Sequence, residues 1–182
     1  MAARGDGARA GADGARPLMG ALAARKDALV SRWLARTLET YPERTARFLA
    51  QERDPFRNPV GQALKEALPG LLDELLGAMD AGRLAALLDG IVRIRAVQDF
   101  TAGQAVAFVF LLKRVIRDAL AHEIRQHAEG AELAAVEGRI DEMALLAFDQ
   151  FMRCRERLYE IKAAQAGRST ALLARMRERA RP

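Results

Sequence analysis

The 182-residue sequence predicts an all-α domain that ends in a long helix, and three observations support this prediction. Leucine and alanine dominate the composition while β-branched residues are few, which favours helix over strand. Apolar residues recur at spacings of three and four, and no alternating run of five or more residues lies between turn signals. Helix start signals precede several of these stripes. The length fits one domain.

The N-terminal part is predicted as a tail followed by two helices. Residues 1–17 are mainly Gly, Ala, Arg and Asp, with too few large apolar groups to offset the entropy of ordering, so we expect a disordered tail. Helical spacing predicts a first helix over Leu18–Tyr41, which Pro42 ends because the residue before a proline avoids helical dihedrals. A short helix over about Glu43–Arg53 follows. The residues expected to face the core here are Leu22, Leu29, Trp33, Thr37, Tyr41, Phe48 and Leu49.

Two further helices are predicted in the middle of the chain. Asn58 followed by Pro59 is a helix start, since Asn can cap and proline at the first helical position loses no hydrogen bond. The leucine stripe that follows runs to about Met79 and keeps its phase across Pro69, which predicts a kink there and not a break. A second helix covers about Ala81–Val97.

The central helix is predicted over about Ala102–His127. Thr101 with Gln104 fits a capping box at its start. Residues 105–112 are all apolar, and Lys113 closes this run before it could span a bilayer. A helix that is apolar nearly all round belongs in the centre of a helical domain, where catalytic chemistry is not expected.

The C-terminal part is predicted as one long helix and a short arm. Gly130 marks a turn, and the apolar stripe over Leu133–Ala166 outlines a helix of roughly 50 Å. This is longer than a compact domain needs, so part of it should project or pack against a second chain. Gly167 is expected to end this helix, and Ser169 to cap a last basic segment at 170–179.

The net charge of +5 is concentrated at the two ends of the chain. Residues 1–26 carry +3 and residues 168–182 carry +4, whereas the remainder carries −2. We therefore divide the chain into a tail (1–17), a helical domain (18–166) and a basic arm (167–182). A nucleic-acid-binding domain concentrates charge on one face of its fold, so this pattern argues against nucleic acid, although the arm could contact it or an acidic partner.

Cys154 is the only cysteine, which excludes an intrachain disulfide and suits a reducing compartment. Residues 1–20 lack an apolar stretch of signal-peptide length and no segment is predicted to span a membrane, so we expect a cytoplasmic protein. Cys154 lies on the apolar stripe, which favours a buried structural role. Redox sensing is the alternative, because Arg153, Arg155 and Arg157 could lower its pKa.

The segment around Arg93, Arg95 and Asp99 is the main candidate for a ligand or partner contact. Arg95 and Asp99 are spaced i, i+4 and could pair, and basic groups are favoured near a helix C-terminus, so a structural role is the first interpretation. Binding of an anion or signal ligand is the second. Four large aromatic residues are interpreted as part of the hydrophobic core and not as the lining of a ligand pocket: Trp33, Phe100, Phe108 and Phe110.

Three stretches together resemble a known family. They are Tyr41-Pro42, DPFRNPVG from Asp54 to Gly61, and RIRAVQDF from Arg93 to Phe100. In this combination the sequence resembles the N-terminal domain of the RsbT co-antagonist family, the RsbR-type stressosome sensors, densely over about 29–120 and more loosely to about 161.

The resemblance implies a globin-like all-α fold that holds no haem, forms a homodimer and works in signalling without catalysis. Longer family members continue into a phosphorylatable STAS domain, for which this sequence leaves no room, so only the sensor half is expected here. His122 and His127 are interpreted as surface residues, since five residues separate them and they do not share a helix face as metal ligands would. Because the resemblance is to a globin-like fold, the alternative hypothesis is a haem-binding sensor with His122 as the axial haem ligand.

Overall fold

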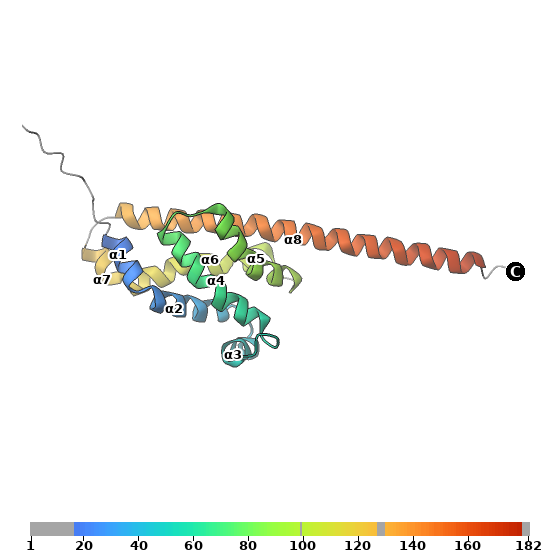
Figure 1. Cartoon of the computed structure of the whole chain (residues 1–182), viewed down its shortest axis with the longest axis horizontal. Coiled ribbons are helices and arrows are strands. Elements are labelled where there is room, and N and C mark those ends of the chain that lie inside the picture. Colours follow the sequence, from blue (N-terminus) through green and yellow to red (C-terminus); the bar gives the residue numbers. More distant parts are fainter. Residues whose placement is uncertain (1–16, 99, 127–129, 180–182) are drawn as a thin grey trace, which may run out of the picture.

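The computed structural model describes residues 17–98, 100–126 and 130–179, and these residues form helices joined by short turns (Figure 1). The prediction of an all-α fold with a long C-terminal helix is confirmed. The likeness to globins stays an expectation from the family. In chain order the helices are α1 (Pro17–Ala24), α2 (Lys26–Leu38), α3 (Glu43–Gln51), α4 (Pro59–Leu76), α5 (Ala81–Val97), α6 (Ala102–Ala119), α7 (Ala121–Gln126) and α8 (Gly130–Arg179).

The core lies between α6, α5, α4 and α2 on one side and the N-terminal half of α8 on the other (Figure 1). The predicted capping box is present, with both Thr101 and Gln104 engaged, and the apolar run behind it is buried over most of its length. Phe108 stacks on Trp33, whose Nε1 donates to the Phe108 carbonyl at 2.6 Å. Phe110 and Phe48, expected in the core, are instead 46% and 43% exposed.

Two predicted helices are each interrupted by a break that the periodicity does not signal. The expected helix from Leu18 to Tyr41 is divided at Arg25, and the central helix ends at Ala119, before α7 begins. The two breaks meet in space, because Arg25 Nη1 donates to the Ala119 carbonyl at 2.7 Å. Leu120 between α6 and α7 is fully buried, so the apolar stripe continues in phase across the break. His127 lies outside the described residues.

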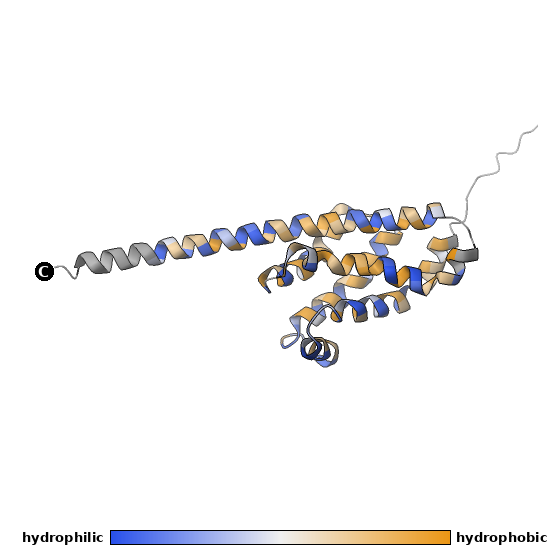
Figure 2. Cartoon of the chain, turned by 180° about the vertical axis from the view of Figure 1, so that it is seen from behind, coloured by the Kyte–Doolittle hydropathy of each residue, from blue (hydrophilic) through white to orange (hydrophobic). Residues whose placement is uncertain are grey.

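The expected end of the long helix at Gly167 is wrong, since α8 continues through it to Arg179. Ser169 does not cap a new segment; its hydroxyl donates to the Gln165 carbonyl within the same helix at 3.1 Å. A single glycine costs a helix only about 1 kcal/mol, which does not by itself terminate it. The fifty residues of α8 span about 75 Å. The helix projects from the body, and its coloured part shows mixed hydropathy (Figure 2).

The turn before α4 is built around Asn58, which is 2% exposed. Its Oδ1 accepts from the Gly61 amide at 2.8 Å, while its Nδ2 donates to the carbonyls of Leu49 (2.8 Å) and Glu52 (3.0 Å) at the end of α3. One side chain therefore caps two helices. The predicted start of α4 is confirmed, and the helix continues through Pro69 without a break.

Side chains of α8 fasten it to the ends of the helices beneath it. Arg139 Nη1 donates to the carbonyls of Leu75 and Gly77 at the end of α4, at 2.8 and 3.0 Å. Arg155 Nη1 donates to the Ala96 carbonyl near the end of α5 at 3.1 Å. Cationic donors at helix C-termini satisfy carbonyls that have no partner within the helix.

We expect Arg139→Met to lower the free energy of unfolding by about 1–2 kcal/mol, because two carbonyls lose a charged donor while the apolar stem is retained. Urea denaturation followed by circular dichroism measures this loss. Arg153→Met, at an exposed position on the same helix, is the control and should change stability by less than about 0.5 kcal/mol. Equal losses in the two variants would contradict the assigned capping role.

Candidate functional site

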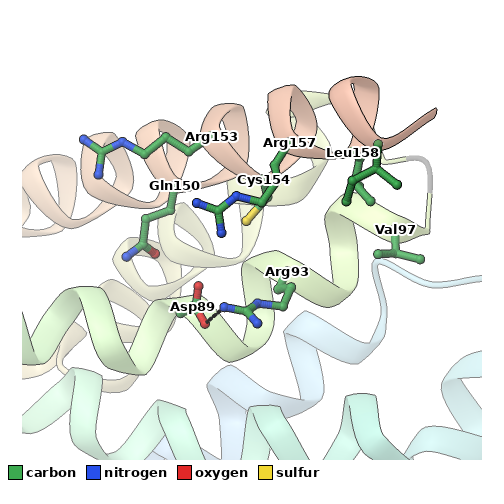
Figure 3. A pocket seen from close by; sticks show the side chains of 9 residues that line it. Asp89, Arg93, Val97, Gln150, Arg153, Cys154, Arg157 and Leu158 are labelled. Atoms are coloured by element: carbon green, nitrogen blue, oxygen red, sulfur yellow. Dashed lines mark hydrogen bonds and ion pairs between the residues drawn. The ribbon is translucent and has the colours of Figure 1, made fainter. Parts of the chain in front are cut away.

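A groove of about 390 Å³ lies between α5 and α8, at the place where α8 leaves the body of the domain (Figure 3). It forms because α5 ends at Val97 whereas α8 continues past it. We call it the α5–α8 groove, and its lining residues are Asp89, Arg93, Val97, Gln150, Arg153, Cys154, Arg157, Leu158 and Ile161.

The groove has a polar part that carries more basic than acidic groups. Arg93 Nη2 pairs with Asp89 at 2.7 Å across one turn of α5. The Arg157 guanidinium extends toward Cys154, whereas the Arg153 guanidinium points away from α5 (Figure 3). Of the three arginines of the lining, Arg93 alone has an ion-pair partner among the described residues.

Gln150 lies at the inner end of the groove and joins its two walls. Its Nε2 donates to the Ala85 carbonyl on α5 at 2.8 Å. Its Oε1 is buried and accepts no hydrogen bond within the described part of the chain. The groove therefore contains an acceptor that lacks a donor, an arrangement that buried polar atoms normally avoid.

Arg93 and Cys154, singled out from the sequence for different reasons, both line this groove. Cys154 is half-buried and packs against the core. Cys154 was expected to be buried, and the structure buries it only in part. The alternative role in redox sensing stays a prediction. Val97 and Gln150 were not predicted as site residues, because nothing in the sequence indicates which faces of α5 and α8 meet.

Arg95 does not share the groove with Arg93. Two residues apart on a helix are separated by about 200°, so the two side chains lie on nearly opposite faces of α5. Arg95 is 1% exposed, and its Nη1 donates to the carbonyls of Gln104 (3.1 Å) and Ala105 (3.2 Å) in α6. Its guanidinium carbon lies 5.0–5.3 Å from the centroids of three rings, those of Tyr41, Phe100 and Phe108.

The remaining polar atoms around Arg95 are incompletely satisfied. Arg95 Nε and Nη2 and the Tyr41 hydroxyl are all buried without a hydrogen-bond partner within the described ranges. Burial lowers the pKa of Arg95 from its ordinary value, and the neighbouring Tyr41 hydroxyl partly opposes this. The expected pairing with Asp99 concerns a residue outside the described ones. No acidic side chain within the described ranges pairs with Arg95.

A row of large apolar side chains is exposed on α8, along the flank of the helix that borders α6. We call it the outer stripe; it consists of Leu145 (67% exposed), Phe148 (41%), Met152 (39%) and Tyr159 (58%). With 100° of turn per residue, this stripe lies about 180° around the helix from the α8 residues of the groove. The two surfaces therefore face in opposite directions.

The outer stripe extends sideways onto α6. Arg117 pairs with Glu137 at 2.6 Å and Lys113 pairs with Asp141 at 2.7 Å, which sets an antiparallel register between the two helices. The same register places the exposed Phe110 level with Leu145. The apolar surface is therefore broader than α8 alone would present.

His122 is exposed on α7, a helix of six residues, and so lies outside the buried core. Its exposure lends no support to an axial haem ligand inside the helical core. In the part of the chain that the structure describes, no cluster of three or more His, Cys, Asp or Glu side chains is arranged to hold a metal ion. None of the described helices is both long and apolar enough to cross a membrane.

These observations define the class of protein: an all-α domain with one projecting helix and a lateral groove. The family model of the RsbT co-antagonist protein rsbRD N-terminal domain matches residues 27–166, and the chain belongs to this family. It is accordingly a regulatory domain of stress signalling. Searches of curated proteins and of solved structures found no match.

Proposed function

We propose that the protein is a non-enzymatic sensory module of stress signalling, cytoplasmic, which acts as a homodimer and passes its signal to a regulatory protein through α8. Family membership supports the signalling role. The single observation that supports the dimer is the outer stripe, because monomeric domains rarely leave several large apolar side chains exposed in line.

The spacing of the outer stripe suits a second copy of the same helix. Leu145, Phe148, Met152 and Tyr159 are separated by three, four and seven residues, the a and d positions of a heptad. In the sequence, the same register continues to Leu173 and Met176. Arg155 and Lys162 occupy the intervening d positions. The Arg155 guanidinium is already bound to the Ala96 carbonyl of α5, whereas a basic group such as Lys162 in a seam restricts register and oligomeric state at some cost in stability.

The double variant Phe148→Glu/Met152→Glu tests the dimer. Two carboxylates in an apolar interface should weaken self-association by about 100-fold or more. Size-exclusion chromatography with light scattering at micromolar concentration is expected to give a dimer for the wild type and a monomer for the variant, with unchanged helical circular dichroism. A wild type that is strictly monomeric in this range would overturn the proposal.

Phe56→Glu is the matched control, since Phe56 is 96% exposed in the turn before α4. This variant should remain dimeric. A second measurement reports the geometry: Met152→Cys in a Cys154→Ser background should form an interchain disulfide if the two stripes run parallel and in register, because disulfides need Cα atoms within about 7 Å. An equally cross-linked Phe56→Cys variant would indicate random collision instead.

A further inference from the structure

We propose that the α5–α8 groove binds a small amphiphilic anion, with the anionic head at Arg157 and Arg93 and the apolar body along Val97, Leu158 and Ile161. The role of this ligand as the signal of a sensor rests on the proposed function, whereas the binding itself does not. The volume of about 390 Å³ lies within the range of small-molecule sites.

The charge of the groove favours an anion. Three arginines and one aspartate line it, and the aspartate is already paired with Arg93. The Arg157 guanidinium is exposed, extends along α8 toward Cys154 (Figure 3), and has no ion-pair partner in the described part of the chain. A guanidinium offers paired N–H donors that match a carboxylate, so it can bind such a head group and orient it.

The outer end of the groove favours an apolar body. The core-facing side of α8 is buried up to Phe151, and the same face then continues as Leu158 and Ile161. Because α5 ends at Val97, this face loses the helix that would cover it, and Val97 and Ile161 are 63% and 48% exposed. An apolar ligand would cover these side chains and remove them from water.

The inner end favours a ligand that also carries a hydrogen-bond donor. Gln150 lines the groove while its Oε1 is buried in the wall without a donor, and a small rotation of the side chain would let Oε1 accept from a ligand hydroxyl. We therefore expect a hydroxylated apolar carboxylate to bind more tightly than the unsubstituted acid.

The position of the groove is compatible with the proposed dimer and gives binding a consequence. A second copy on the outer stripe would leave the groove open, since the two surfaces lie on opposite sides of α8. A ligand in the groove contacts α5 and α8 together at the point where α8 leaves the body. Binding is thus able to alter how α8 is held at its exit.

Isothermal titration calorimetry with octanoate, 3-hydroxyoctanoate and octan-1-ol tests the chemical class. We expect octanoate to bind, the hydroxy acid to bind more tightly, and the alcohol to bind at least about tenfold more weakly because it has no charge for Arg157. Arg157→Gln should weaken octanoate about tenfold, while Arg44→Gln, an equal charge change on exposed α3, should leave it unchanged. Absence of binding at millimolar octanoate, or equal binding of acid and alcohol, would overturn the proposal.

Cys154 reports whether a ligand occupies this groove. As the only thiol in the chain, it can be labelled selectively with a thiol reagent, and octanoate should slow the labelling at the concentrations that produce heat. If octanoate produces heat in the titration but does not slow the labelling of Cys154, the ligand binds elsewhere and the proposed site is wrong. The same titration on Phe148→Glu/Met152→Glu separates the two proposals, since binding should persist in that variant whether or not the wild type dimerises.

Discussion

Asn58→Ala is expected to lower the free energy of unfolding by about 3 kcal/mol, the sum of one lost helix cap and two lost hydrogen bonds, one buried and one part-buried. The loss is large for a single polar side chain because the same carboxamide serves the end of α3 and the start of α4. Urea denaturation at constant protein concentration measures the change.

Two controls separate the functions of this carboxamide. Asn58→Asp keeps an acceptor for the Gly61 amide but loses the donation to α3, so it should retain part of the stability. Asp80→Ala removes a comparable but exposed cap, that of α5, and should cost about 1 kcal/mol. If Asn58→Ala costs no more than Asp80→Ala, the bridging role is wrong.

Arg95→Ala is expected to lower the free energy of unfolding by about 3 kcal/mol, whereas Arg95→Met should leave it within about 1 kcal/mol of the wild type. Alanine leaves a cavity between three rings, while methionine fills most of that space and removes a buried charge with two unsatisfied donor atoms. The same denaturation experiment compares the two variants.

The comparison decides whether the guanidinium itself stabilises the fold. Burial of a charge opposes folding, while the two carbonyl contacts and the surrounding rings favour it. Should methionine prove as destabilising as alanine, the charge makes a net favourable contribution. If methionine preserves stability, as we expect, the charge of Arg95 makes no net contribution to the stability of the fold.

The sequence signals that proved reliable are local ones. The Asn58–Pro59 start and the Thr101–Gln104 capping box depend only on neighbouring residues, and both are confirmed. The breaks at Arg25 and Leu120 were not predictable, because the apolar stripe stays in phase across each and the partner that stabilises the break is distant in sequence. Gly167 was over-interpreted, since the cost of one glycine is small.

The candidate site was predictable only in part, for the same reason. The sequence indicates Arg93 and Cys154 as separate candidates, but their common groove depends on how α5 and α8 pack. The grouping of Arg93 with Arg95 ignored the geometry of the helix, on which residues two apart point in different directions. The burial of Arg95 among Tyr41, Phe100 and Phe108 involves segments from the turn after α2 to α6, which no local pattern brings together.

The unbroken course of α8 gives it the properties of a lever. Beyond Phe151, the last core residue, the helix extends for about 42 Å to Arg179. If the part of α8 that packs on the body tilts by about 10°, the far end of the helix moves by about 7 Å, which is more than the rise of one helical turn. A side-chain-sized rearrangement beside α5 would thus be amplified mechanically into a movement that a bound partner could register.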